Sequence, residues 1–424
     1  MLTARGVALC GVAVAAWTLG RFLGVDELYV VSAAALAMVG LAIVSTRVSS
    51  ARIAVRRNTT ARHAHRDERV PIEIALRNDG RLPASLLLVE DRRPSGIAGD
   101  DDTAARFVVR GLRPRKLADL QWHALGRRRG RYTIGPVRIR LRDPFGLAER
   151  SRRYRATDDL VVFPPIEPLM SGGTRGIRHG ADTSASQRAF HRGDEFHTMR
   201  NYVVGDDLRH VHWPSTAHRG ELMVRQHELP WQARAVVYLD NRASDHLGAG
   251  DRSTLERCVS AAASVLSHLD RQRYEVALVT GGPPPRRSDA RLEAALIRLA
   301  ELAPVADTAP IATLRAVERA GNGLLVAVVR PPVRRVTAPL DAGPDDDLAD
   351  HVEVRALQQA GRGYRTRVAL IVEHTDAARC GTLARLLRLA GWRTAVAAQG
   401  TPLADVWQQA MVGDEIGRLA GARR

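Results

Sequence analysis

Two long apolar runs at the start of the chain constrain its fold more than any other feature. Gly6 to Val25 and Leu28 to Thr46 consist mostly of apolar residues, and only Asp26 and Glu27 lie inside the turn between them. At a rise of about 1.5 Å per residue, either run can cross the hydrocarbon core of a bilayer as a helix. A cleaved signal peptide is the alternative interpretation of the first run, but a second run follows it at once. The sequence therefore predicts a transmembrane helical hairpin over residues 1–47.

The charges that flank the hairpin predict its orientation. Arg5 precedes the first run, and a cluster of arginines follows the second run: Arg47, Arg52, Arg56 and Arg57. The turn carries two acids, and Arg21 near it can extend its charged end to the membrane surface. Lys and Arg near the ends of spans mark the cytoplasmic side. We therefore expect membrane lipid around the two helices and a cytoplasmic location for the soluble part.

The net charge of +17 raises the question of a nucleic-acid partner. The arginines are spread along the whole chain, however, and aromatic residues make up only 4% of it, too few for base-stacking platforms. We expect no nucleic acid as a partner. A basic nucleic-acid-binding protein remains an alternative function.

The scarcity of lysine and cysteine excludes several kinds of chemistry. Lys116 is the only lysine and has no P-loop context, so neither phosphate binding of that type nor a lysine-dependent kinase or Schiff-base mechanism is available. Cys10, Cys258 and Cys380 are scattered and form no disulfide framework or zinc motif. We predict no catalytic residue, no cofactor and no bound metal.

Short strands separated by turns characterise residues 48–163. Val70 to Leu76 and Ser85 to Glu90 flank the turn residues Asn78, Asp79 and Gly80, and apolar side chains alternate through Gly130 to Arg142. Regular short strands with turns of this composition predict an antiparallel β-sandwich of immunoglobulin-like type.

The remaining chain divides into a linker and an α/β domain. Residues 164–230 begin with a Pro- and Gly-rich linker. In residues 231–424, strands alternate with helices, as in Ala235 to Leu239 followed by a helical pattern from Ser253 to Leu269. Such alternation predicts a mostly parallel, Rossmann-like sheet with helices on both faces. The predicted fold class is thus α+β multidomain.

The loop after the first strand of this α/β domain is a candidate site, because ligands bind at the carboxyl ends of such strands. It begins with Asp240 and contains Arg242 and Ser244. It resembles the Asp-x-Ser-x-Ser motif of von Willebrand factor A domains, which implies that fold for residues 231–424. In that family these oxygen atoms help to hold a divalent cation. Arg242 replaces the first Ser, and Arg330 follows another strand where the family usually has Asp. We predict that Asp240 and Ser244 are the remnant of a degraded metal site.

The densest group of charged and aromatic residues lies between the two soluble domains. It resembles the core motif of the bacterial domain of unknown function 58 (DUF58) family, Arg-x-Tyr-x-x-Gly-Asp-x-x-Arg-x-x-x-Trp followed by Gly-x-Leu-x-Val-Arg. The matching residues are Arg200, Tyr202, Gly205, Asp206, Arg209, Trp213, Gly220, Leu222, Val224 and Arg225. His218 departs from the pattern, because members often have Arg there. Asp143 to Leu147 also resembles the Asp-Pro-Phe-Gly-Leu turn of the family.

The resemblance implies a role without an assigned activity. Family members often accompany MoxR-type AAA ATPases, so we expect a membrane-anchored scaffold or interaction protein of a chaperone-like or cell-envelope system. The core motif is then structural or partner-binding, with Asp206 and Trp213 structural and Arg200 and Arg209 partly exposed. A hydrolase that uses the Asp/His-rich core motif is the alternative from another functional class.

The topology of the hairpin can be tested with a fused reporter. A reporter that is active only in the cytoplasm, fused after Arg424, should be active, because the arginines that follow Thr46 keep that side of the membrane inside. The measurement is reporter activity in intact cells. Activity of a periplasm-dependent reporter at the same position would overturn the predicted orientation.

Overall fold

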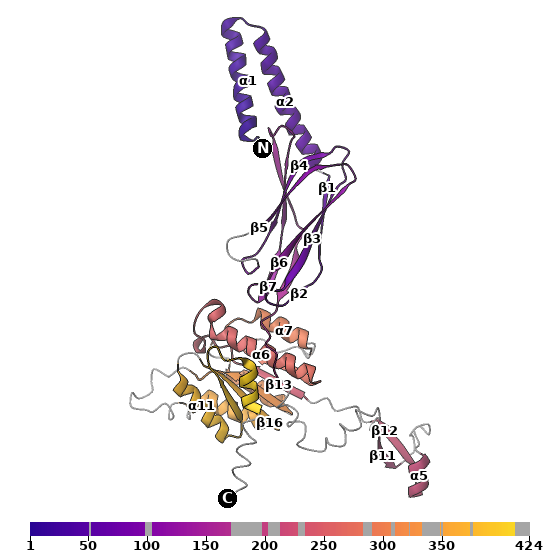
Figure 1. Cartoon of the computed structure of the whole chain (residues 1–424), viewed down its shortest axis with the longest axis vertical. Coiled ribbons are helices and arrows are strands. Elements are labelled where there is room, and N and C mark those ends of the chain that lie inside the picture. Colours follow the sequence, from indigo (N-terminus) through magenta and orange to yellow (C-terminus); the bar gives the residue numbers. More distant parts are fainter. Residues whose placement is uncertain are drawn as a thin grey trace. The chain divides into compact units, whose positions relative to one another are not determined.

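The computed structural model forms two compact units, Met1–Pro164 and Pro165–Arg424, and each is described here by itself (Figure 1). The structure describes residues 1–50, 52–97, 104–170, 197–201, 213–227, 234–282, 291–306, 310–321, 323–332, 348, 351–373 and 376–411.

The first unit begins with the two predicted apolar helices, α1 (Ala4–Leu23) and α2 (Glu27–Ser50). Thr3 caps α1 because its hydroxyl accepts a hydrogen bond from the Gly6 N–H at 3.2 Å. The helix ends at Gly24, whose φ of 67° suits glycine and lets the chain reverse into α2. Both helices are long and apolar enough to cross a membrane.

Ten β-strands follow in the part of this unit that the structure describes. In chain order they are β1 (Ile53–Thr59), β2 (His63–Ala64), β3 (Arg69–Asn78), β4 (Ala84–Arg92), β5 (Ala104–Leu112), β6 (Leu117–Leu125), β7 (Gly130–Ile134), β8 (Val137–Arg142), β9 (Glu149–Tyr154) and β10 (Asp158–Val162). They build sheets with the strand orders β1-β3-β6, β5-β4-β8-β9 and β2-β10-β7, in which only the β2–β10 pair is parallel.

The two larger sheets bury one shared core. Alternate residues of β3, such as Ile72 and Ile74, are fully buried, and Leu87 of β4 and Ile139 of β8 belong to the same cluster. This alternation is what the sequence predicted, and the unit is an antiparallel β domain. The immunoglobulin-like identity of its topology stays a prediction.

A buried ion pair crosses this core. Asp91 accepts a hydrogen bond from Trp122 Nε1 at 2.9 Å and another from Arg57. Burial raises the pKa of the Asp91 carboxyl, and the Arg57 guanidinium opposes that rise. Arg57 also donates to the Ile134 carbonyl at 2.5 Å, so one guanidinium joins strands from all three sheets.

The second unit contains a five-stranded parallel sheet. Its strands are β13 (Arg234–Leu239), β14 (Glu275–Thr280), β15 (Leu324–Val329), β16 (Thr366–Val372) and β17 (Arg393–Ala397), in the order β14-β13-β15-β16-β17. The helices are α6 (Thr254–Arg271), α7 (Leu292–Glu301), α8 (Pro310–Arg319), α10 (Val352–Gly361) and α11 (Ala377–Leu389), and residues 403–411 are also helical.

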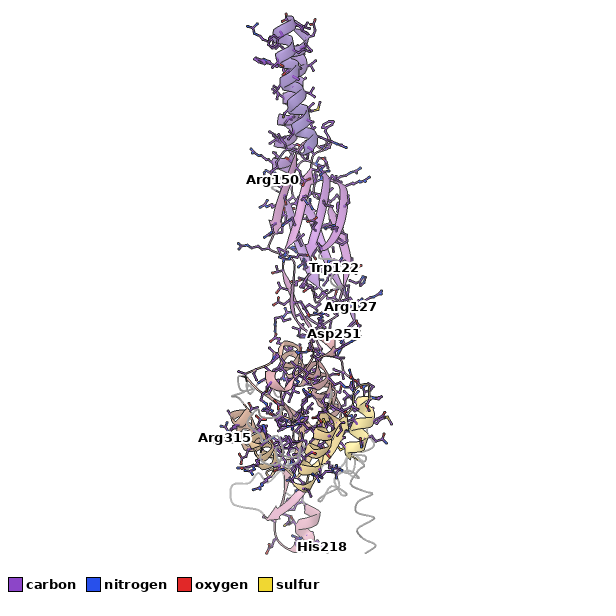
Figure 2. All side chains as sticks on the ribbon, turned by 90° about the vertical axis from the view of Figure 1, so that its left-hand side faces the viewer. Trp122, Arg127, Arg150, His218, Asp251 and Arg315 are labelled. Atoms are coloured by element: carbon purple, nitrogen blue, oxygen red, sulfur yellow. The ribbon has the colours of Figure 1, made fainter. Side chains whose placement is uncertain are left out.

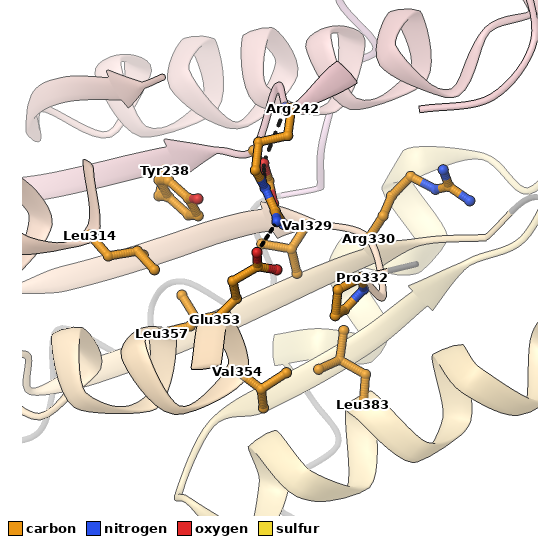
Figure 3. A pocket seen from close by; sticks show the side chains of 11 residues that line it. Tyr238, Arg242, Leu314, Val329, Arg330, Pro332, Glu353, Val354, Leu357 and Leu383 are labelled. Atoms are coloured by element: carbon orange, nitrogen blue, oxygen red, sulfur yellow. Dashed lines mark hydrogen bonds and ion pairs between the residues drawn. The ribbon is translucent and has the colours of Figure 1, made fainter. Parts of the chain in front are cut away.

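Helices cover both faces of this sheet (Figure 3). Apolar residues of α8, α10 and α11 form one core cluster with alternate residues of the strands, among them Tyr238 and Ala327. The intervening strand residues Val237 and Leu239 are buried as well, and α6 contacts four of the five strands. A parallel sheet with alternating helices confirms the predicted class of this region, whereas the von Willebrand factor A identity stays a prediction.

The strand order defines where a site can form. The chain runs from β13 outward to β14 and then returns to β15 on the other side of β13. This reversal opens a crevice at the carboxyl ends of β13 and β15, where ligands of such sheets bind.

Candidate functional site

The crevice between the ends of β13 and β15 contains a buried cluster of charged side chains. Asp240 directly follows β13, Arg330 directly follows β15, and Arg242 lies two residues beyond Asp240. Asp240 is 7% exposed, Arg242 5% and Arg330 9%. Charged residues are seldom buried this deeply unless they are paired.

Arg242 binds the Asp240 carboxylate through two nitrogens. Its Nε donates to Oδ1 at 2.9 Å and its Nη2 donates to Oδ2 at 2.6 Å (Figure 3). This fork is the strongest pairing available to the two groups, because two parallel charge-assisted bonds fix both distance and orientation. Both Asp240 oxygens therefore bind the guanidinium.

A second carboxylate, that of Glu353, completes the cluster. Glu353 lies in the first turn of α10, and its Oε1 pairs with Arg242 Nη1 (Figure 3). One guanidinium thus links the end of β13 to a helix more than one hundred positions later in the sequence. His351 lies 3.4 Å from the other Glu353 oxygen.

The backbone of the loop is fixed by Asn241. Its side-chain amide donates to the Ala303 carbonyl at 2.9 Å, and its Oδ1 accepts from the Gly281 N–H at 2.9 Å. The backbones of Asn241 and Val305 are also hydrogen-bonded, at 2.9 Å. Neighbouring loops therefore hold the segment that carries Arg242, and the guanidinium has little freedom to leave the carboxylates.

The groups on the α6 side of the crevice add a second cation and a histidine. Arg330 Nη1 lies 3.4 Å from the Thr254 hydroxyl, at the first residue of α6. His246 makes a hydrogen bond to the Asp240 carbonyl at 2.9 Å and another to the Thr254 hydroxyl at 3.2 Å. Burial lowers the pKa of His246, and the hydrogen bond to the Asp240 carbonyl opposes that shift.

Little space is left between these side chains. The cavity that Asp240, Arg242, Arg330 and Glu353 line has a volume of about 20 Å³, which is room for one water molecule. Mg²⁺ demands near-octahedral oxygen ligands, and here the Asp240 oxygens already bind a cation. The residues present do not fit a divalent metal.

Ser244, the other predicted member of the metal-site remnant, is exposed on a short 3₁₀ turn formed by Ala243–Asp245. Among the residues that the structure describes, no three His, Cys, Asp or Glu side chains gather as metal ligands. The sequence interpretation named the loop after β13 but did not include Glu353 or His246. The local signal for Glu353 is its place as the acid in the first turn of α10.

The core motif is described only in part. Its strands β11 (His197–Asn201) and β12 (Met223–His227) pair antiparallel, with Arg200 opposite Val224 and Met199 opposite Arg225. Tyr202, Gly205, Asp206 and Arg209 lie outside the described residues.

A short helix, α5 (Trp213–Arg219), precedes β12 in the chain. Thr216 links the two elements, since its hydroxyl accepts from the Met223 N–H at 3.0 Å. Trp213 begins α5 and is 66% exposed. The structural and the partner-binding interpretations of Trp213 both stay predictions.

Comparison with known proteins supports the family resemblance. The model of the family described as "Protein of unknown function DUF58" matches residues 198–330, a range that includes Trp213, Asp240 and Arg330. A curated relative, the uncharacterized protein YeaD of Bacillus subtilis (strain 168), is 24% identical over 204 residues. This match covers 48% of the present chain and 49% of the relative, so the chain spans about half the length of the curated relative it matches.

Similarity to solved structures is weak. The CARDB domain of the PF1109 protein from Pyrococcus furiosus is 16% identical to this chain, with a TM-score of 0.19. The match covers 26% of this chain and 91% of that domain. The sporulation control protein Spo0M from Bacillus subtilis is 14% identical over 36% of this chain and 58% of its own, with a TM-score of 0.16. TM-scores this low support no argument about fold or function.

The site leads to a prediction about its stability. Replacing Arg242 with Ala leaves two carboxylates buried without their cation, so the free energy of unfolding should fall by about 3–5 kcal/mol. Millimolar Mg²⁺ should raise the melting temperature of Arg242→Ala more than that of the parent, because the ion can then approach Asp240 and Glu353. The measurement is thermal unfolding of the full chain with and without Mg²⁺.

Arg234→Ala is the matched control. Arg234 pairs with Glu275 on the same sheet, but its side chain is 68% exposed, and pairs of this kind contribute about 1 kcal/mol or less. Calorimetry that detects micromolar Mg²⁺ binding to the parent protein would contradict this account of the site.

Proposed function

We propose that this protein is a membrane-anchored scaffold or interaction protein whose soluble part faces the cytoplasm, and that it is not an enzyme. The single observation that carries the proposal is the Arg242 guanidinium held between Asp240 and Glu353. A crevice at this position is where an α/β domain normally binds its ligand. Here a fixed internal cation occupies that crevice, and the cavity beside it has room for only one water molecule.

The state of the buried thiols is consistent with a non-enzymatic role. Burial raises the pKa of Cys258 to about 12 and that of Cys380 to about 11. Because the thiolate is the nucleophile, a thiol that stays protonated at neutral pH is a poor one.

We further propose that α5 and the β11–β12 pair form the element that binds a protein partner. Trp is enriched among the residues that dominate binding energy at protein interfaces, and Trp213 is two-thirds exposed. A MoxR-type AAA ATPase is the partner class that the family resemblance favours, in a chaperone-like or cell-envelope system.

The test is affinity capture of the full-length protein from its native membrane. Trp213→Ala should lose most of an ATPase that the parent captures, since removing such an anchor costs about 2 kcal/mol or more of binding energy. Its melting temperature should match that of the parent, because Trp213 is exposed. Leu389→Ala, at an 82% exposed position on α11, is the matched control and should retain the partner.

Two outcomes would contradict the proposal. One is equal capture of the ATPase by the parent and Trp213→Ala. The other is hydrolase turnover by the purified parent that Trp213→Ala or a substitution of Asp206 abolishes.

A further inference from the structure

Three turns of the β domain lie at the end that carries α1 and α2, called here the helix-side end. In the β3–β4 turn, the Asp79 N–H donates to the Arg52 carbonyl just after α2, at 2.8 Å. The β5–β6 turn adjoins it, since the Arg115 N–H donates to the Asn78 carbonyl at 2.7 Å. In the β8–β9 turn, the Thr3 hydroxyl donates to the Gly146 carbonyl at 2.5 Å, next to the start of α1.

The β8–β9 turn packs directly against the helices. Asp143 holds its shape by accepting hydrogen bonds from the Phe145 and Ala148 N–H groups, at 2.9 and 2.6 Å. Leu147 and Ala148 form a small apolar cluster with Ala42 of α2. Ala42 lies six residues before Val48, where the candidate span ends. At the helical rise per residue, the turn therefore reaches about 9 Å inside the end of the span.

Exposed apolar side chains gather at the same end. Phe145 is 62% exposed in the β8–β9 turn, Leu117 61% at the start of β6, and Leu82 50% in the β3–β4 turn. Among the described residues from 52 to 164, Val108 is the only other large apolar side chain this exposed. Single exposed apolar residues need no explanation, but three around one end of a domain indicate a surface that is covered by something apolar.

Basic side chains surround these apolar ones. The exposed basic residues near the helix-side end are Arg5, Arg47, Arg52, Arg81, Arg113, Arg115, Lys116, Arg142 and Arg150. Arg150 lies close to the helices, whereas Arg127 lies toward the opposite end of the domain (Figure 2). Among these basic residues, Arg142 pairs with Glu149. The acidic residue Asp79, which lies at the same end of the domain, pairs with Arg77. No carboxylate in the described part of the chain lies within 4.0 Å of Arg81, Arg113, Arg115 or Lys116.

We propose that the helix-side end of the β domain is a docking surface for anionic lipid headgroups. Phe145, Leu117 and Leu82 enter the interfacial layer of the bilayer, and Arg81, Arg113, Arg115 and Lys116 bind lipid phosphates. A bilayer surface is the partner that offers both chemistries at this level, because the surface lies where the spans end and acyl carbons meet phosphates there. The inference rests on the proposed membrane anchoring.

Spin labels on the full chain in phosphatidylglycerol-containing nanodiscs test the apolar contact. Cys10→Ser removes the one cysteine that is not buried, so a label can be placed at Phe145, Leu117 or Val108 through single cysteine substitutions. Labels at Phe145 and Leu117 should be more accessible to dissolved oxygen than to a water-soluble nickel chelate. The label at Val108, which is 58% exposed on the sheet away from the turns, should show the opposite preference.

A label at Leu36, in the middle of α2, separates this inference from the membrane anchor itself. If Leu36 lies in hydrocarbon but Phe145 and Leu117 lie in water, the docking surface is overturned and the anchor stands. If Leu36 also lies in water, both fail.

Charge substitutions test the headgroup contact. The quadruple variant Arg81→Gln, Arg113→Gln, Arg115→Gln, Lys116→Gln should retain much less phosphatidylglycerol than the parent when both are purified from mixed neutral and anionic lipid. Each basic residue at an anionic surface contributes about fivefold to affinity. The matched control carries Gln at four exposed arginines toward the other end of the β domain: Arg62, Arg69, Arg127 and Arg155. Equal phosphatidylglycerol retention by the two variants would overturn the proposal. The finding that an acidic protein binds this surface of the parent in place of lipid would overturn it as well.

Discussion

The pairing of Arg242 with Asp240 and Glu353 is the interaction on which the second unit depends. Removing three charges from water is costly, and the cost is offset only where each group has well-placed partners. The structure meets this condition with a bidentate fork on one side and a helix-borne carboxylate on the other. Because Asn241 fixes the loop to two neighbouring segments, the guanidinium is held where a ligand of this fold class would otherwise bind. The proposed non-enzymatic function rests on this same pairing, because the Arg242 guanidinium fills the crevice between β13 and β15.

A second constraint governs the first unit. Only two residues separate α2 from β1, and the β8–β9 turn packs beside both helices, so the helical hairpin and the β domain form one compact unit. If the hairpin spans a membrane, the turns at its base are brought to the bilayer surface by the same contacts. The Asp143 to Leu147 turn was identified in the sequence by its resemblance to the family. This packing gives the turn a structural role. It shapes the backbone that contacts α1 and presents Phe145 outward.

The sequence predicted those elements whose burial leaves a periodic pattern. The two apolar helices, β3 with its alternating core residues, and the largely apolar β13 were all identified, because apolar spacing directly reports the buried face. The edge strand β9 was missed because its residues are mostly charged and exposed, and the ten-residue α8 was also missed. Asp240 was found from its place after a strand. Glu353 could not be found, because its pairing with Arg242 depends on how α10 packs against the sheet. The exposure of Trp213 likewise follows from tertiary structure and not from residue type.

The central claim is that an arginine side chain, and no metal ion, neutralises the carboxylates in the crevice. The most direct measurement is the ¹⁵Nε–H nuclear magnetic resonance signal of Arg242, assigned by its disappearance in Arg242→Lys. A guanidinium locked in a buried fork should give a sharp signal that exchanges slowly with water and does not shift when millimolar Mg²⁺ is added. A signal that exchanges rapidly, or that moves as micromolar Mg²⁺ is titrated, would contradict the account.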